Sequence, residues 1–196
     1  MLAHRHPRTG NRPKVFQGRS SRIYDLAART VLRHLYRRLA RDVATAAPSG
    51  AAVLDIGTGP GVLLVELARL RPDLTLAGLD LSADMVSAAR RNLARHGDRA
   101  TVEVGDVAAL PYEDGSVAAV VSTMSQHHWP DRAAGFRELR RVLRPGGRVL
   151  VYDLRPLLRL AGGPARAAFE GRPVRSEPVR TSRLPVRVFA RLSATG

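Results

Sequence analysis

The stretch that decides the fold is Ala51-Ala52-Val53-Leu54-Asp55-Ile56-Gly57-Thr58-Gly59-Pro60-Gly61. A short apolar run precedes three glycines at alternate positions, and a helical pattern of apolar residues begins directly after them. This order predicts a buried strand, a tight turn and a helix start, an arrangement that brings backbone close to a nucleotide-like ligand in α/β proteins. We therefore expect the ligand to lie against this turn.

Strand-like and helix-like segments alternate along the chain on both sides of that stretch. Strands are expected at 51–56, 74–79, 101–104, 117–122 and 148–153, and helices at 61–70, 82–96 and 131–143. An amphipathic helix is expected from Ser20 or Ser21 to about residue 47, a short helix at 156–169, and two edge strands at 173–180 and 184–192. The alternation predicts an α/β fold, a doubly wound, mostly parallel seven-stranded Rossmann-like sheet with an antiparallel C-terminal edge hairpin.

Length and composition restrict the class of protein. A chain of 196 residues fits one domain with a sizeable core. The absence of cysteine excludes disulfides, thiolate metal sites and thiol nucleophiles. No apolar run approaches the ~20 residues of a membrane span, and residues 1–18 lack the apolar segment of a signal peptide. We expect a soluble, cytoplasmic protein with a flexible basic tail at 1–18 and one domain at 19–196.

The net charge of +15 raises the question of nucleic-acid binding. The net charge is +9 over residues 1–50, −1 over residues 51–154 and +7 over residues 155–196, so the excess lies at the two ends. Lys14 is the one lysine beside 31 arginines, which indicates a bias of the whole chain. Because aromatic residues, the usual stacking platforms for bases, make up only 5% of the chain, nucleic acid is the less favoured substrate. The row of arginines at 29, 33, 37 and 41 has no carboxylate partner within its own helix, and we expect it to face solvent.

Three acidic residues, Asp55, Asp80 and Asp106, stand at or just after the ends of the first three predicted strands. Open α/β sheets bind ligands at this carboxyl edge. Carboxylates accept hydrogen bonds from a ribose diol or pair with an ammonium group, whereas they repel a pyrophosphate. The dinucleotide motif G-x-G-x-x-G would also need a glycine where Val62 stands. The pattern therefore favours S-adenosylmethionine over a dinucleotide, and a nicotinamide oxidoreductase ranks last among the alternatives.

Five motifs in order resemble those of class I S-adenosylmethionine-dependent methyltransferases. The motifs are Val53 to Gly61, Gly78-Leu79-Asp80-Leu81-Ser82-x-x-Met85, Gly105-Asp106-Val107-x-x-Leu110-Pro111-Tyr112-x-Asp114-Gly115-Ser116, His127-His128-Trp129, and Arg141-Val142-Leu143-Arg144-Pro145-Gly146-Gly147-Arg148. The chain is most similar to the small-molecule subgroup, type 11, that includes quinone-biosynthesis enzymes. The resemblance covers the predicted cofactor-binding core at 51–153 and fades over the N-terminal lid or substrate helix at 19–50 and the C-terminal helix and edge strands at 154–196.

The resemblance implies roles for matching residues. The turn with Gly57, Thr58, Gly59 and Gly61 would pass under the amino-acid portion of S-adenosylmethionine, and Asp55 would anchor its ammonium group through water or backbone. Asp80 would hold the ribose hydroxyls, and Leu81 and Met85 would line the adenine. Asp106 would accept a hydrogen bond from the adenine amine, and the N–H of Val107 would contact the ring. Ser122 would face the methionine end, and Tyr24 is similar to tyrosines of a lid that closes over the cofactor.

His127 lies in the loop after the fourth predicted strand, where a general base could serve an oxygen acceptor. The competing interpretation is that His127 and His128 pack this loop while Trp129 anchors it against the sheet. No metal site is expected, because no ligand cluster stands out. The favoured function is methyl transfer to a small organic acceptor on O, N or C. The alternatives are an RNA or protein methyltransferase that uses the basic termini, and a non-catalytic S-adenosylmethionine-binding protein; a homodimer stays open.

Overall fold

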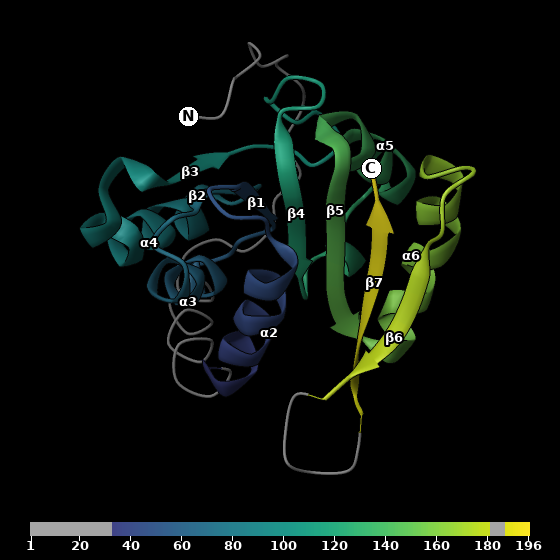
Figure 1. The fold of residues 1–196 in the computed structure, drawn as a ribbon, viewed down its shortest axis with the longest axis horizontal. Helices are drawn as coiled ribbons and strands as arrows, with labels where there is room; N and C mark the ends of the chain where they lie inside the picture. The colour runs from purple at the N-terminus through teal and green to yellow at the C-terminus, as the bar shows by residue number, and fades with distance from the viewer. Residues whose placement is uncertain (1–32, 181–186) are drawn as a thin grey trace.

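The computed structural model describes residues 33–180 and 187–196. These residues form one seven-stranded sheet in the order β3-β2-β1-β4-β5-β7-β6 (Figure 1). The strands are β1 (Ala52–Ile56), β2 (Thr75–Asp80), β3 (Ala100–Val104), β4 (Val117–Thr123), β5 (Leu143–Leu154), β6 (Arg175–Val179) and β7 (Phe189–Thr195). Strands β1 to β5 are parallel to one another, whereas β7 runs antiparallel to both β5 and β6. The predicted doubly wound sheet with an antiparallel C-terminal edge is confirmed.

Helices cover both faces of the sheet, as Figure 1 shows. They are α2 (Arg33–Ala46), α3 (Val62–Leu70), α4 (Ala83–Leu93), α5 (Arg132–Val142) and α6 (Arg155–Ala168), with short 3-10 turns at Ala94–Arg99 and Gln126–His128. Helices α2, α3 and α4 pack on one face and α5 and α6 on the other, each over its own apolar cluster. Strand β4 lies between the two layers and is buried at every position, which explains the apolar run Val117–Val121 at its start. Across the described ranges, no helix combines the length and apolarity that crossing a membrane requires.

Two strands, β5 and β7, differ from the expectations, α6 lies within one residue of its expected bounds, and one expected helix lies partly outside the described residues. The helix expected from Ser20 or Ser21 is described only from Arg33 onward, because residues 1–32 lie outside the described ranges. Strand β5 already begins at Leu143, and the Pro145-Gly146-Gly147 segment forms an irregularity within the strand, where its pairing with β4 shifts register. The C-terminal helix α6 is continuous over 14 residues despite Pro164. The second edge strand, expected at 184–192, lies at Phe189–Thr195 and is inserted between β5 and β6.

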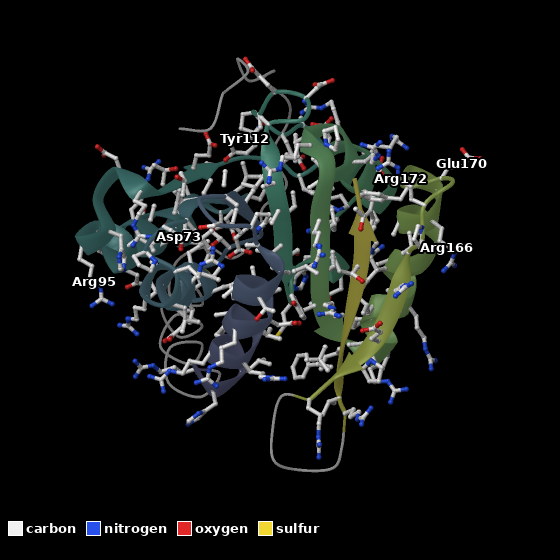
Figure 2. The ribbon with its side chains drawn as sticks, viewed as in Figure 1. Asp73, Arg95, Tyr112, Arg166, Glu170 and Arg172 are labelled. Carbon is white, nitrogen blue, oxygen red and sulfur yellow. The ribbon has the colours of Figure 1, made fainter. Side chains whose placement is uncertain are left out.

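The arginines of α2 correct one expectation. Arg33 and Arg37 do not simply face solvent, because their Nε atoms lie 3.4 Å and 3.5 Å from the carboxylate of Glu66 on α3. Arg69 reaches the same carboxylate at 3.2 Å. The acidic partner that the helix lacks in its own sequence is thus supplied by the neighbouring helix, and it joins α2 to α3. Other arginines, such as Arg95 on one side and Arg166 on the other, project outward at the periphery (Figure 2).

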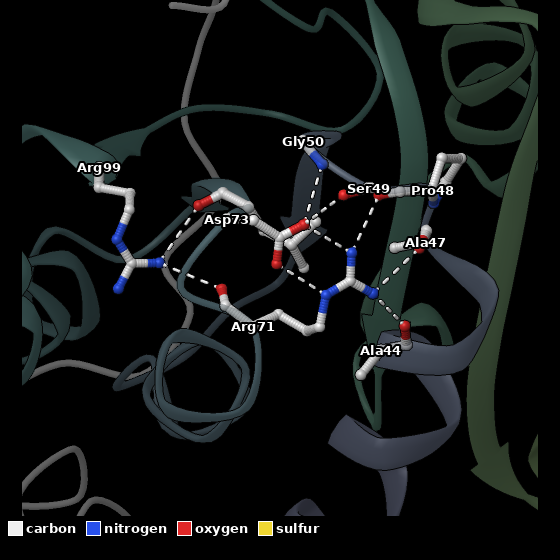
Figure 3. A network of polar contacts seen from close by, with 9 residues as sticks. Ala44, Ala47, Pro48, Ser49, Gly50, Arg71, Asp73 and Arg99 are labelled. Carbon is white, nitrogen blue, oxygen red and sulfur yellow. Dashed lines mark hydrogen bonds and ion pairs between the residues drawn. The ribbon is translucent and has the colours of Figure 1, made fainter.

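Arg71 fastens the end of α2 to the turn between α3 and β2 (Figure 3). Its Nη1 donates to the carbonyl oxygens of Ala44 (2.6 Å) and Ala47 (3.2 Å), and its guanidinium also forms a bidentate pair with Asp73 (2.7 Å and 2.8 Å). The last carbonyl groups of a helix have no partner within the helix, so Arg71 supplies the donors that α2 lacks. These contacts join the C-terminal end of α2 to the turn between α3 and β2.

Candidate functional site

A pocket opens at the carboxyl ends of the parallel strands, where this class of sheet places its ligands. The pocket lies where the connections from β1 and β4, which are neighbours in the sheet, leave in opposite directions. Its wall is formed by Tyr36 of α2, residues 56–59 after β1, residues 79–81 and Met85 after β2, residues 105–107 after β3, and residues 123–125 and 128–130 after β4. All four strand ends that the sequence marked with acidic or hydroxyl residues therefore meet at one place.

The glycine turn after β1 adopts backbone angles that favour glycine. Gly57, Gly59 and Gly61 have φ values of 67°, 54° and 74°. A Cβ at Gly57 would overlap the hydroxyl of Ser125, and a Cβ at Gly61 would lie 3.1 Å from Ala89 of α4. Gly57 and Gly59 line the pocket, whereas Gly61 lies behind it and lets the start of α3 approach α4.

The N–H groups of this turn are already used inside the protein. Gly57 and Thr58 both donate to the carbonyl of Leu79, at 2.8 Å and 3.1 Å, and Gly59 donates to the carboxylate of Asp80 at 2.8 Å. Gly61 donates to the carbonyl of Thr58 at 3.0 Å, and the intervening proline has no N–H to offer. A phosphate cradle needs free N–H groups that converge on the anion. The turn therefore lacks the chemistry of a pyrophosphate site.

Asp55 lies beneath the turn and does not reach the pocket wall. Its side chain is 1% exposed, its Oδ2 accepts a hydrogen bond from the Thr58 hydroxyl at 2.8 Å, and its Oδ1 has no partner. Burial raises the pKa of Asp55 to about 7; the Thr58 hydrogen bond partly offsets this shift, and the charge of Asp80 adds to it. A buried carboxylate with one unsatisfied oxygen is suited to a nearby cation or to a donor-bearing water.

Asp80 ends β2 and lies in the pocket wall. Its Oδ2 accepts from the N–H of Gly59 and its Oδ1 from the N–H of Ser82 at 2.9 Å, so the carboxylate links the glycine turn to the start of α4. Burial raises the pKa of Asp80, and these two hydrogen bonds act against that shift. Each carboxylate oxygen keeps acceptor capacity beyond one hydrogen bond, which allows a pair of hydroxyl groups to bind as well.

Asp106 and Val107 line the pocket on a loop that is fastened from α5. Arg141 of that helix donates to the carbonyl oxygens of Leu110 (3.0 Å) and Tyr112 (2.8 Å). Glu138 accepts from the N–H of Leu110 at 2.7 Å and pairs with Arg141 through two contacts of 2.7 Å. Helix α5 thus holds the loop through the backbone groups of Leu110 and Tyr112. Its pocket-lining residues are positioned from a helix that does not itself reach the pocket.

His127 and Asp153 form a pair beside the pocket. His127 Nδ1 lies 2.8 Å from Oδ2 of Asp153. Asp153 is the second-last residue of β5 and is fully buried. The same carboxylate accepts from Gln126 Nε2 at 3.0 Å and from the N–H of Leu154 at 2.8 Å. Since the carboxylate acts as acceptor, Nδ1 of His127 carries the proton and Nε2 is left as the basic nitrogen. The His127 ring lies 4.0 Å from that of His128, which is in the pocket wall.

The sequence-predicted residues fall into three groups. The first group lines the pocket: Gly57, Thr58, Gly59, Asp80, Leu81, Met85, Asp106 and Val107. The second group lies next to the pocket without forming its wall: Asp55, Gly61, Ser122 and His127. Tyr24 lies outside the described residues.

Three of the contributors that sequence reasoning missed make contacts that matter for the site. Tyr36 lines the pocket from α2, Asp153 partners His127, and Ser125 bridges the glycine turn and the loop after β4. Asp153 could have been found, because it ends the fifth predicted strand as Asp55 and Asp80 end theirs. No local pattern marks the other two.

The charge of the pocket differs from that of the chain. Among the residues that the structure describes, its wall contains the carboxylates of Asp80 and Asp106 but no arginine or lysine, although the chain has a net charge of +15. In the described part of the chain, no three side chains of the metal-ligating types gather to hold an ion. Acidic side chains in an otherwise largely apolar wall suit a neutral or cationic ligand that carries hydroxyl or amine donors.

Comparison of the sequence with known proteins finds a matching family and several relatives. Residues 53–147 match the family described as a methyltransferase domain. Demethylmenaquinone methyltransferase of Roseiflexus castenholzii is 40% identical over 126 residues, which cover 62% of this chain and 52% of that protein. A ubiquinone/menaquinone biosynthesis C-methyltransferase of a Geobacter species is 31% identical over 149 residues, which cover 74% and 63%. The chain spans about half the length of the curated relatives it matches.

Solved structures share the fold over nearly the whole chain. An S-adenosylmethionine-dependent methyltransferase from Aquifex aeolicus superposes with a TM-score of 0.74 at 19% identity, covering 91% of this chain and 99% of that one. Phosphoethanolamine N-methyltransferase 2 of Haemonchus contortus, solved with S-adenosylmethionine, gives a TM-score of 0.65 at 17% identity, covering 87% and 59%. Residues 53–147 are thus similar in sequence to a methyltransferase domain, and the chain shares the fold of S-adenosylmethionine-dependent methyltransferases.

Proposed function

We propose that the protein transfers a methyl group from S-adenosylmethionine to a small organic acceptor. The observation that carries this proposal is the chemistry of the glycine turn and its surroundings. The N–H groups of the turn donate to oxygen atoms of the protein itself, and the carboxylates of Asp80 and Asp106 line the pocket beside it. This combination favours an adenosine with a cationic end and disfavours a nucleotide phosphate. Relatives named for demethylmenaquinone and for ubiquinone/menaquinone biosynthesis support a quinone-type acceptor as the first class to test.

The residues present fit S-adenosylmethionine. The unsatisfied Oδ1 of buried Asp55 is suited to the ammonium group through an intervening water or backbone group. Asp80 has the acceptor capacity for the ribose hydroxyls, and Asp106 and Val107 would read the adenine beside Leu81 and Met85. When bound, the cofactor supplies an electrophilic methyl group on a sulfonium. The chain's part is to hold the acceptor in line with that methyl group and to exclude water, because placement supplies much of the rate in such a displacement.

His127 is proposed as the general base for acceptors whose nucleophile carries a hydroxyl proton. Asp153 fixes the tautomer by accepting the Nδ1 proton, and Gln126 holds Asp153 in turn by donating to it at 3.0 Å and to the Leu157 carbonyl at 2.9 Å. A base that is oriented by a buried carboxylate matches the arrangement in which histidine takes a proton through Nε2.

The domain limits, a cytoplasmic location and a homodimer stay predictions.

The Asp80→Asn variant tests the proposed function. We expect S-adenosylhomocysteine to bind this variant about tenfold to a hundredfold more weakly, because a charged acceptor for two ribose hydroxyls is lost. The measurement is isothermal titration calorimetry, with Asp84→Asn as the control, since Asp84 is an exposed carboxylate four residues further along that lies outside the pocket wall. Unchanged affinity in Asp80→Asn would refute the assignment of this strand end.

Cofactor binding should depend on pH through Asp55. With a pKa of about 7, against its usual value of 3.8, Asp55 holds its proton in the free protein below neutrality. Because the folded protein raises this pKa, Asp55 contributes to the free energy of unfolding most at low pH, and that contribution declines as the pH rises from about 4 to 7. An ammonium group nearby needs the charged form, so binding should release a proton and weaken by up to about tenfold per pH unit below 7.

The comparison for Asp55 is calorimetry between pH 5.5 and 8 in buffers of different ionisation enthalpy. Wild-type protein should release a proton on binding S-adenosylhomocysteine at pH 6, whereas Asp55→Asn should not release that proton. Since the raised pKa of Asp80 also contributes, the quantity of interest is the difference between the two proteins. Identical proton release in both would show that Asp55 does not respond to the ligand.

Replacing His127 tests the proposed base. With 1,4-naphthohydroquinone as acceptor, His127→Gln and Asp153→Asn should each lower the methyl-transfer rate by about a hundredfold or more, the usual contribution of general-base catalysis. Their affinity for S-adenosylhomocysteine should stay within about threefold of wild type, because neither residue lines the pocket. His34→Gln serves as the control, since His34 is exposed on α2. A full rate in His127→Gln combined with a lost rate in His128→Gln would assign the base to the neighbouring histidine instead.

A further inference from the structure

The hydroxyl of Ser125 makes three contacts that join separate parts of the pocket wall. It donates to the carbonyl of Ile56 at the end of β1 (3.0 Å). It lies 2.8 Å from the hydroxyl of Ser122 on β4, and it accepts from the indole Nε1 of Trp129 at 3.3 Å. Two strand ends and one side chain of the following loop therefore converge on a single oxygen atom.

These contacts use the full hydrogen-bonding capacity of the group. A serine hydroxyl has one proton to donate and two lone pairs that accept. Because the proton goes to Ile56, Ser122 must donate to Ser125, and Trp129 takes the remaining lone pair. A ligand could bond to this hydroxyl only by displacing one of the three partners. Ser125 is thus arranged to hold protein groups in place rather than to act on a substrate.

The backbone before Ser125 adopts a conformation that non-glycine residues seldom adopt. Met124 has a φ of 51°, and no other non-glycine residue in the described ranges has a positive φ. This left-handed step is held by the N–H of Met124, which donates to the carbonyl of Tyr152 on β5 at 2.8 Å. Residues in such conformations persist only where the surroundings hold them, and they concentrate at functional sites. Here the step turns the Ser125 side chain back over the glycine turn.

The close approach of Ser125 to the glycine turn explains why residue 57 is a glycine. A Cβ at position 57 would overlap both the hydroxyl and the Cβ of Ser125, so the close approach of the two segments requires glycine at that position. Both residues line the pocket. The distance between the turn after β1 and the loop after β4 is therefore set by direct contact as well as by the Ser125 hydrogen bonds.

Trp129 is held from two sides. Ser125 accepts its indole N–H, and on the other side its ring packs on α5, where it lies 5.5 Å from the ring of Phe136. Gly135 of the same helix leaves room for it, since a Cβ there would lie 2.9 Å from an indole carbon. Trp129 lines the pocket on the loop after β4, and in the sheet β4 lies on the other side of β1 from β2 and β3, the strands whose ends lead to Asp80 and Asp106.

We infer that Ser125 is a positioning residue that fixes the Trp129 side of the pocket against the glycine turn and so aligns the acceptor with the methyl donor. This inference rests on the proposed function for the identity of the two ligands. Its structural part, that one hydroxyl holds Trp129 in place, stands independently of them. A displacement of about 1 Å in such a wall is sufficient to cost a large factor in rate.

Trp129 provides the readout, because it is the one tryptophan in the sequence. In Ser125→Ala, loss of the indole's partner should raise the acrylamide quenching constant of the free protein about twofold or more, since the indole becomes more mobile and accessible. Ser125→Cys, with a weaker hydrogen-bonding group of similar shape, should fall between this variant and wild type. Ser116→Ala is the matched control: it removes a loop hydroxyl that donates to the Glu113 carbonyl, and its quenching should equal that of wild type.

The second measurement is the affinity of each variant for S-adenosylhomocysteine by calorimetry. Raised quenching in Ser125→Ala with affinity within about threefold of wild type supports a role on the acceptor side. Unchanged quenching would overturn the inference, and so would a loss of affinity above about tenfold, which would assign the hydroxyl to the cofactor turn instead. If the wild-type protein does not bind S-adenosylhomocysteine, the proposed function fails. The quenching comparison still decides whether Ser125 holds Trp129.

Discussion

The carboxylate of Asp80 is the contact on which the rest of the site depends. It receives the N–H of Gly59 on one oxygen and that of Ser82 on the other, so the turn after β1 and the start of α4 are held at one fixed separation. Together with the Leu79 carbonyl, it also consumes the N–H groups that would otherwise attract a phosphate. A single acidic residue at a strand end thus shapes the turn and places negative charge in the pocket wall.

Much of the fold could be predicted because its signals are local. Alternating apolar segments define parallel strands and crossover helices, and the glycines after Ile56 mark the turn. The acidic residues at strand ends could be placed together for the same reason, since parallel strands bring their carboxyl ends to one edge. The β5 boundary was harder to place, because Pro145-Gly146-Gly147 reads as a turn although the strand continues through it with a shift in register.

The contacts that could not be predicted join residues far apart in the chain. Arg33 and Arg37 look unpaired along their helix, and Glu66 becomes their partner only once α3 packs beside α2. Ser125 looks like an ordinary loop residue, and its role depends on the left-handed step at Met124 and on its contact with Gly57. His127 stood out as a candidate base without a partner, and Asp153 supplies that partner from the end of a different strand. In each case tertiary packing adds the information that sequence spacing lacks.

The central claim is that the pocket accepts an adenosine with a cationic end and rejects a pyrophosphate. Titration calorimetry of the unaltered protein with S-adenosylhomocysteine, NAD⁺ and ADP under the same conditions tests it most directly. We predict saturable binding of S-adenosylhomocysteine at least about a hundredfold tighter than that of either nucleotide, a difference of about 2.7 kcal/mol or more. Equal or tighter binding of NAD⁺ or ADP would contradict the account.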